Sequence, residues 1–156
     1  MSGTAPSIHV PPPLILLAGS LAGMGLDWLI PLSIVPTTHS LVWVVVKWGL
    51  LGSGIAFGFS GFLTFVRVRT GILPNQPVTE FVVHGPYRFS RNPMYVGLTL
   101  AYAGFALHVK SLWPLLTLPL ALWVLWKLVI QKEEAFLTKT YGDAYTSYQK
   151  RVRRWI

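Results

Sequence analysis

The stretch with the most chemical content is HGPYRFSRNPMYVG, at residues 84–97. It places Arg88 and Arg91 just before the pair Asn92–Pro93, and asparagine followed by proline is a typical helix start. The backbone amides of a first helical turn have no partner within the helix, so they attract anions. With two arginines nearby, they indicate a site for an anionic group. The alternative is a positively charged helix start that only anchors to lipid headgroups.

Two tyrosines add aromatic surface to the same stretch. Tyr87 and Tyr95 offer ring faces for a nucleoside base and hydroxyl groups for polar contacts. The open amides of the predicted first turn lie near Met94 and Tyr95. The stretch therefore combines positive charge, open amides and aromatic rings.

A second group of functional candidates follows the last apolar run of the chain. Glu133 and Glu134 begin the segment EEAFLTKTYGDAYTSYQKRV, at residues 133–152. Apolar and aromatic residues recur in it at spacings of three and four, which predicts an amphipathic segment lying on the bilayer or on neighbouring elements. Gly142 followed by Asp143 indicates a helix end and a new start, so we expect two short helices. For the glutamates, the alternative to a binding role is that they are solvated helix-end charges.

Composition places these motifs in a membrane protein. Of the 156 residues, 53% are hydrophobic and only 12% are charged, whereas a soluble domain has about 25% charged residues. A helix needs about 20 apolar residues to cross a bilayer. Four apolar runs come near this length, at 14–35, 41–66, 93–108 and 113–130. We expect one all-α integral membrane domain with about four transmembrane helices, a cytoplasmic loop at 67–92 and a cytoplasmic tail of short amphipathic helices at 131–156.

The charge balance is strongly basic. Thirteen lysines and arginines stand against five acidic residues, which gives a net charge of +8. On a soluble chain this would indicate nucleic-acid binding, but on an apolar chain it reports membrane topology. Most basic residues fall in 67–92 and 131–156, so the positive-inside rule predicts that both regions and both termini are cytoplasmic, in a bacterial inner membrane. We expect the lipid bilayer as a partner and no nucleic acid.

Small residues and one acid mark the first two apolar runs. Gly19 with Gly23, and Gly54 with Gly58, have the GxxxG spacing that lets helices approach closely in lipid. These two runs are expected to pack on each other or on a second copy of the chain, as a homodimer. Asp27 is the one acid inside a run, and an intramembrane carboxylate is a functional candidate. Its place near the end of the run favours a structural role instead.

Taken in order, these motifs resemble a known enzyme family. HGPYRFSRNPMYVG, an apolar helix, EE-x-x-L and then YG-x-x-Y-x-x-Y-x-x-R-V are similar to the isoprenylcysteine carboxyl methyltransferase and phospholipid methyltransferase family of integral membrane enzymes. The resemblance covers about residues 78–153. It implies methyl transfer from S-adenosylmethionine to a small or lipid-soluble acceptor at the cytoplasmic membrane face.

The resemblance also implies the residues that hold the cofactor. They are Phe81, Val82, Tyr87, Asn92, Pro93, Met94, Tyr95 and Glu133. Arg88 joins them because its charge suits the carboxylate of the cofactor. Where the family most often has histidine, this chain has Asn92, which hydrogen-bonds but does not titrate near neutral pH.

Three further residues complete the predicted catalytic set. Glu134 or His84 is the candidate base for an amine acceptor, which must lose a proton, and Arg91 supplies positive charge. A carboxylate acceptor requires no base. No metal is expected, because transfer of a methyl group from a sulfonium centre needs only alignment and exclusion of water. The absence of cysteine also excludes thiolate metal sites and cysteine nucleophiles.

The acceptor and two other functions stay open at this point. Prenylcysteine enzymes of the family carry an arginine about one turn before the acidic pair, and this chain has Val129 there. That favours a lipid, amine or thiol acceptor over a prenylcysteine. One alternative function is an NADPH-dependent membrane reductase related to sterol reductases, for which the chain is short. The other is a four-helix small-molecule transporter that uses Asp27.

Overall fold

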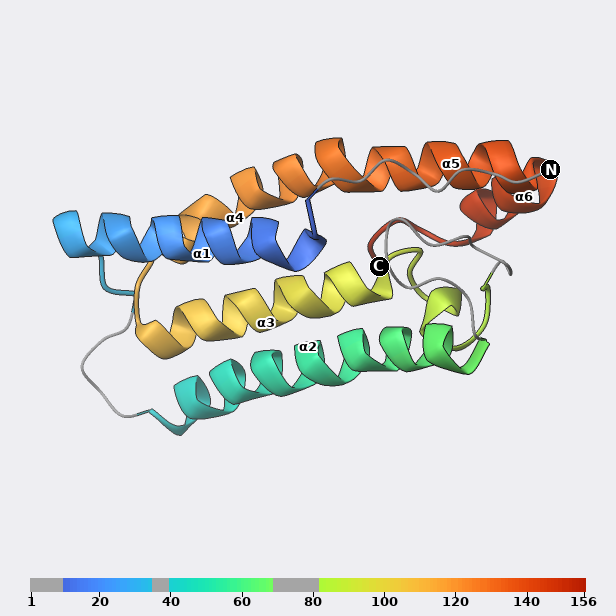
Figure 1. Cartoon of the computed structure of the whole chain (residues 1–156). Coiled ribbons are helices and arrows are strands. Elements are labelled where there is room, and N and C mark those ends of the chain that lie inside the picture. Colours follow the sequence, from blue (N-terminus) through green and yellow to red (C-terminus); the bar gives the residue numbers. More distant parts are fainter. Residues whose placement is uncertain (1–9, 35–39, 69–81) are drawn as a thin grey trace.

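The computed structural model describes residues 10–34, 40–68 and 82–156 (Figure 1). All regular elements in these ranges are helices, and they confirm the predicted all-α class. The helices are α1 (Pro12–Leu29), α2 (Leu41–Val68), η1 (Gly85–Arg88), α3 (Pro93–Val109), α4 (Trp113–Leu125), η2 (Trp126–Ile130), α5 (Gln131–Tyr141) and α6 (Asp143–Arg151). The helix α1 is shorter than the apolar run 14–35 because Ile30 is extended and Pro31 follows it.

Three of the described helical stretches are long and apolar enough to cross a membrane. They are Pro12–Leu29, Leu41–Arg67 and Trp113–Tyr141, the last of which joins α4, η2 and α5 into one rod. The helix α3 is also apolar but has only 17 residues, about 25 Å at 1.5 Å per residue. The all-α membrane fold is therefore confirmed, whereas the number of spans and their cytoplasmic loop and tail stay predictions.

The helices pack in two pairs that lie one above the other in Figure 1, with α1 on α4 and α2 on α3. In the second pair, a side chain at Gly97 of α3 would collide with the backbone of Gly54 and Gly58 of α2. Backbones approach this closely in lipid only where the facing residues are small. The glycine pair of α2 thus packs against α3. The sequence predicted that this pair would pack against the first apolar run or a second copy of the chain.

The glycine pair of α1 is covered in the same way. Gly19 lies against Ala121, and Gly23 lies against the backbone of Pro114, both in α4. Both glycine pairs therefore face helices of their own chain. The homodimer through glycine-rich helix faces stays a prediction.

Asp27 has a structural partner at the end of α1. Its carboxylate accepts a hydrogen bond of 3.1 Å from the backbone amide of Leu32. Close by, Ser33 forms an isolated bridge with Ser111, and the Trp113 indole donates to the carbonyl of Ile30 at 2.6 Å. Asp27 therefore belongs to a set of contacts that ties the end of α1 to the start of α4.

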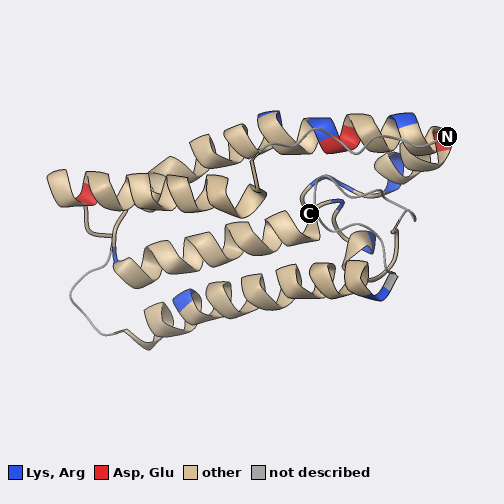
Figure 2. Ribbon diagram, viewed as in Figure 1, with Lys and Arg blue, Asp and Glu red and all other residues tan. Residues whose placement is uncertain are grey.

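The opposite end of the bundle carries most of the charge. Figure 2 shows most of the lysines and arginines near the end of α2, η1, α5 and α6. The predicted break at Gly142 is present: Gly142 has a φ of 52°, which a side chain would strain, and it separates α5 from α6. The predicted motifs of the chain meet at this charged end.

Candidate functional site

The start of α3 is covered by a distant part of the chain. The helix begins at Pro93, as predicted, but the Asn92 side chain does not cap it. Instead, Asn92 Nδ2 donates to the carbonyl of Arg154 at 3.1 Å, and Ser90 Oγ donates to the same carbonyl at 3.2 Å. The amide of Tyr95 is also engaged, by the carbonyl of Asn92 at 3.0 Å. The start of α3 therefore has fewer groups available to bind an anion than the sequence predicted.

A side-chain hydrogen bond joins the two predicted motifs at α3 and α5. The hydroxyl of Tyr95, in α3, donates to Glu133 Oε1, in α5, at 2.8 Å. Tyr95 is buried and packs in a core cluster with Leu125, Val129 and Ile130. The core thus fixes the ring, and the hydroxyl fixes the carboxylate of Glu133.

Glu134 has different partners from its neighbour. Arg154 binds both of its carboxylate oxygens, with Nε to Oε1 at 2.9 Å and Nη2 to Oε2 at 2.8 Å. Arg91 Nη1 lies 3.3 Å from Oε1. The Glu134 side chain is only 14% exposed, so it is not a solvated helix-end charge. Glu134 holds the segment before α3 and the chain after α6 against α5.

Tyrosines of η1 and α6 close the other side. The Tyr87 ring packs edge-on against Phe65 with centroids 5.2 Å apart, and the Tyr148 hydroxyl donates to the carbonyl of Tyr87 at 2.7 Å. Burial raises the pKa of Tyr148 to about 12. Burial, and then the nearby carboxylate of Glu133, raise the pKa of Tyr87 well above its ordinary value. Both hydroxyls therefore stay protonated at neutral pH, and that of Tyr148 donates to the backbone.

The rod that carries the glutamates changes its winding just before them. Residues Trp126–Ile130 form a π-helical turn, a feature that is rare and frequent at functional sites. Val129 and Ile130 of this turn are fully buried in the cluster with Tyr95. Lys127 lies over the ring of Trp126, 4.6 Å from its centroid. The turn seats the rod on α3 through Val129 and Ile130.

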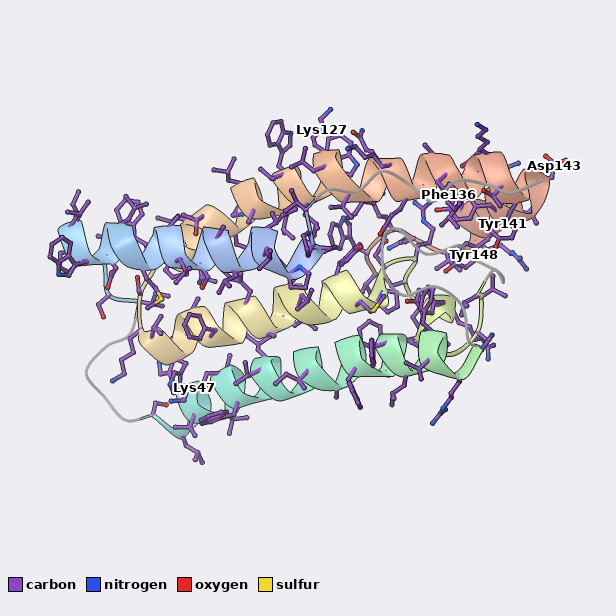
Figure 3. The ribbon with its side chains drawn as sticks, in the orientation of Figure 1. Lys47, Lys127, Phe136, Tyr141, Asp143 and Tyr148 are labelled. Carbon is purple, nitrogen blue, oxygen red and sulfur yellow. The ribbon has the colours of Figure 1, made fainter. Side chains whose placement is uncertain are left out.

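The remaining predicted residues are placed less uniformly. Val82 is buried, and Met94 and Pro93 lie against Gly61 of α2. His84 and Arg88 are exposed. Phe81 lies outside the described residues. Figure 3 shows Tyr148 at the α5–α6 end and Lys47 at the opposite end of the bundle, far from the site.

Comparison with known proteins decides the family. The sequence profile described as Phospholipid methyltransferase matches residues 43–144. The chain belongs to the phospholipid methyltransferase family. This match includes both HGPYRFSRNPMYVG and the acidic pair, so the resemblance of the motifs is confirmed.

Individual members of the phospholipid methyltransferase family give the same result. The chain is 35% identical to phosphatidylethanolamine N-methyltransferase of Mus musculus over 119 residues, which are 74% of this chain and 56% of that protein. It is 34% identical to protein-S-isoprenylcysteine O-methyltransferase of Schizosaccharomyces pombe over 71 residues, 46% of this chain and 30% of that protein. It is 32% identical to phosphatidyl-N-methylethanolamine N-methyltransferase of Saccharomyces cerevisiae over 94 residues, 60% of this chain and 42% of that protein. The chain spans about half the length of the curated relatives it matches.

Unpaired polar atoms in this family member indicate where a ligand fits. Three buried atoms have no hydrogen-bond partner among the described residues: the Tyr87 hydroxyl, Arg91 Nε and Trp126 Nε1. Unpaired buried donors are costly, and a bound polar ligand satisfies them. With Glu133, these atoms are candidate contacts for a polar ligand. The described residues contain no group of three His, Asp or Glu side chains that could hold a metal ion.

The sequence did not single out several residues of this site. Arg154 counted only as one basic residue of the tail, although it contacts Glu134 with its side chain and residues 90 and 92 with its carbonyl. Ser90 lies within the motif at residues 84–97, is fully buried and donates to that carbonyl. The profile match ends at residue 144, before Arg154. The one signal for Arg154 was its place in the basic run at residues 150–154.

Proposed function

We propose that the chain transfers a methyl group from S-adenosylmethionine to the amino group of a phospholipid headgroup at the membrane surface. The hydrogen bond between Tyr95 and Glu133 carries this proposal, because it brings both family motifs together among buried donors that lack partners. Membership of the phospholipid methyltransferase family supports it.

An amine is the acceptor that the observations favour. The relatives named as phosphatidylethanolamine N-methyltransferases match 74% of this chain, whereas the isoprenylcysteine relative matches 46%. Val129, in the position where prenylcysteine enzymes carry an arginine, is fully buried among apolar side chains. A buried valine offers no charge to a substrate carboxylate. The reductase and transporter alternatives are not favoured, because the profile that matches most of the chain describes methyltransferases.

The residues of the chain divide the work of binding. Glu133, fixed by Tyr95, offers its carboxylate to the ammonium or a ribose hydroxyl of the cofactor, while Tyr87 and Arg91 offer donors to its carboxylate. When bound, S-adenosylmethionine supplies a methyl group on a sulfonium, and a new N–C bond forms as the C–S bond breaks and a neutral thioether leaves. The buried start of α3, at Pro93 and Tyr95, and the buried residues of η2 limit the access of water to the reacting groups.

The acceptor amine must lose a proton before or during the transfer. Glu134 is poorly suited to take it, because Arg154 and Arg91 already occupy its carboxylate oxygens. His84 is exposed at the start of η1, where a proton passes readily to water. We therefore favour His84 as the base and Glu134 as the residue that holds the site together.

The test is binding followed by transfer. Calorimetry with S-adenosylmethionine should show binding to the purified chain in lipid nanodiscs. Glu133→Gln should weaken binding about tenfold or more, the equivalent of one charge-assisted hydrogen bond. Lys139→Met, a matched change at an exposed position of α5, should leave it unchanged. A radiolabelled methyl group should then appear on phosphatidylethanolamine. Absence of binding in nanodiscs and in several detergents would contradict the proposal, and binding of NADPH in its place would favour the reductase.

We also propose that the charged end of the bundle faces the cytoplasm. The gathering of lysines and arginines there supports this orientation (Figure 2). Because the chain has no cysteine, a single cysteine at exposed Lys150 or exposed Trp28 reports its own side of the membrane. In intact cells, an impermeant maleimide should label Trp28→Cys and spare Lys150→Cys. The reverse pattern would invert the orientation.

A further inference from the structure

An apolar groove runs along the bundle between α2 and α3. It has a volume of about 500 Å³ and is lined by Ser53, Ala56, Phe57, Ser60, Leu100 and Ile156. The groove is shallow and largely open on one side. Ser53 and Ser60 lie seven residues apart on α2, which corresponds to about 10 Å along the helix axis. The α2 residues that line the groove are therefore spread along the helix axis.

The lining of the groove suits hydrocarbon. Its two serines use their hydroxyls within their own helix, since Ser53 Oγ donates to the carbonyl of Leu50 at 3.2 Å and Ser60 Oγ donates to that of Phe57 at 2.7 Å. The helix α2 is long and apolar enough to span a membrane, and many of its large apolar side chains are exposed. The groove thus opens to the hydrocarbon of the bilayer, and its occupant has to be apolar and supplied from the lipid.

One end of the groove reaches the candidate site. Gly61, next to Ser60, lies against Pro93 and Met94, in the first turn of α3 that also carries Tyr95. On the other side, Ile156 follows Trp155, which packs against the core cluster that contains Tyr95. The groove and the site therefore share the chain after α6 as a common wall, through Ile156 in the groove and Trp155 at the site.

We propose that this groove holds an acyl chain of the methyl-accepting phospholipid, so that its headgroup lies at the end of α3 near Tyr95 and Glu133. The inference rests on the proposed function, which it deepens by assigning the acyl chain of the acceptor to a place in the fold. A chain lying along α2 is parallel to the helices, as acyl chains are in a bilayer. Specificity for lipid then comes from the groove, and chemistry comes from the polar end.

Filling the groove tests the proposal. Ala56→Trp places a large ring in the groove, whereas Ile55→Trp places the same ring on the adjacent position of α2, which does not line the groove. Ala56→Trp should raise KM for long-chain phosphatidylethanolamine about tenfold, which corresponds to the loss of about two buried methylene groups. It should leave the affinity for S-adenosylmethionine and the rate with glycerophosphoethanolamine unchanged, and Ile55→Trp should change none of these. Equal KM values for the two variants would overturn the proposal.

Photolabelling of the unaltered chain gives a second readout that does not depend on activity. A phosphatidylethanolamine with a diazirine in its acyl chain, dilute in phosphatidylglycerol vesicles, should label groove residues above the rest of α2. Excess phosphatidylethanolamine should suppress this labelling, and further phosphatidylglycerol should not. Uniform labelling around α2, or equal competition by both lipids, would show ordinary boundary lipid and overturn the inference. If the unaltered chain methylates no amine, the proposed function fails, while the labelling pattern still decides the occupancy of the groove.

Discussion

Removal of the Arg154 guanidinium should loosen the contact that holds the chain after α6 on α5. Arg154→Met keeps most of the aliphatic stem and deletes both hydrogen bonds to Glu134, which span 2.9 and 2.8 Å. Glu134 then retains only Arg91, at 3.3 Å, among the described residues. Glu134→Gln is the more severe change, because it deprives two arginines of their carboxylate.

The exposure of the two partners sets the expected magnitude. A surface ion pair contributes about 0–1 kcal/mol, and breaking a buried one costs about 3–5 kcal/mol. The Glu134 side chain is 14% exposed and that of Arg154 is 35% exposed, so the pair lies between these limits. We expect a loss of about 2 kcal/mol in the free energy of unfolding for Arg154→Met and about 3 kcal/mol for Glu134→Gln.

A double-mutant cycle measures the pair directly. The free energy of unfolding would be determined in mixed micelles by titration with dodecyl sulfate for both single variants and the double variant. We expect a coupling energy of about 1–2 kcal/mol between the two positions. The surface control Lys139→Met should change the free energy of unfolding by less than about 0.5 kcal/mol. If the single effects of Glu134→Gln and Arg154→Met add to within about 0.5 kcal/mol, the two side chains do not interact in the folded protein and the reasoning fails.

Three further predictions follow from the same structure. Tyr95→Phe removes the donor that fixes Glu133 and should weaken S-adenosylmethionine binding about tenfold by calorimetry, with an unchanged unfolding transition within about 1 kcal/mol. Gly97→Ala should destabilise the fold by about 2 kcal/mol or more, because its new methyl group meets backbone of α2, whereas Gly52→Ala, with open space around it, should be neutral or slightly stabilising in the same titration. Asp27→Asn keeps an acceptor for the backbone amide and should leave methyl transfer unchanged; loss of transfer would show a role beyond the end of α1.

Local features of the fold were predictable because their causes are local. Proline after asparagine marks the start of α3. Gly142, followed by Asp143, marks the boundary between α5 and α6, where the structure has a φ of 52° at the glycine. The partners of the glycine pairs were not predictable. The spacing of Gly54 and Gly58 shows that some backbone comes close, but it carries no information about which helix supplies that backbone. The same spacing fits packing on α1, on α3 or on a second copy.

The site was predictable in its two motifs but not in what joins them. Tyr95 and Glu133 stood out by their surroundings in the sequence, and the fold places them 2.8 Å apart. The role of Arg154 depends on a return of the chain by more than 60 residues to the carbonyl contacts at Ser90 and Asn92. Such a return leaves no periodic signal, because backbone carbonyls are common to all residues.

The π-helical turn at Trp126–Ile130 gives the rod an unequal tolerance to changes in chain length. An α-helix turns by about 100° per residue, and a π-helical turn accommodates one residue more than the α-helix around it. Loss of one residue there closes the turn to an ordinary α-helix and leaves Glu133 and Glu134 facing the same way. An added residue cannot be absorbed in this way, and it rotates both carboxylates by about 100° about the helix axis, away from Tyr95 and Arg154. A deletion in this segment should therefore leave the site in place, whereas an insertion should displace it.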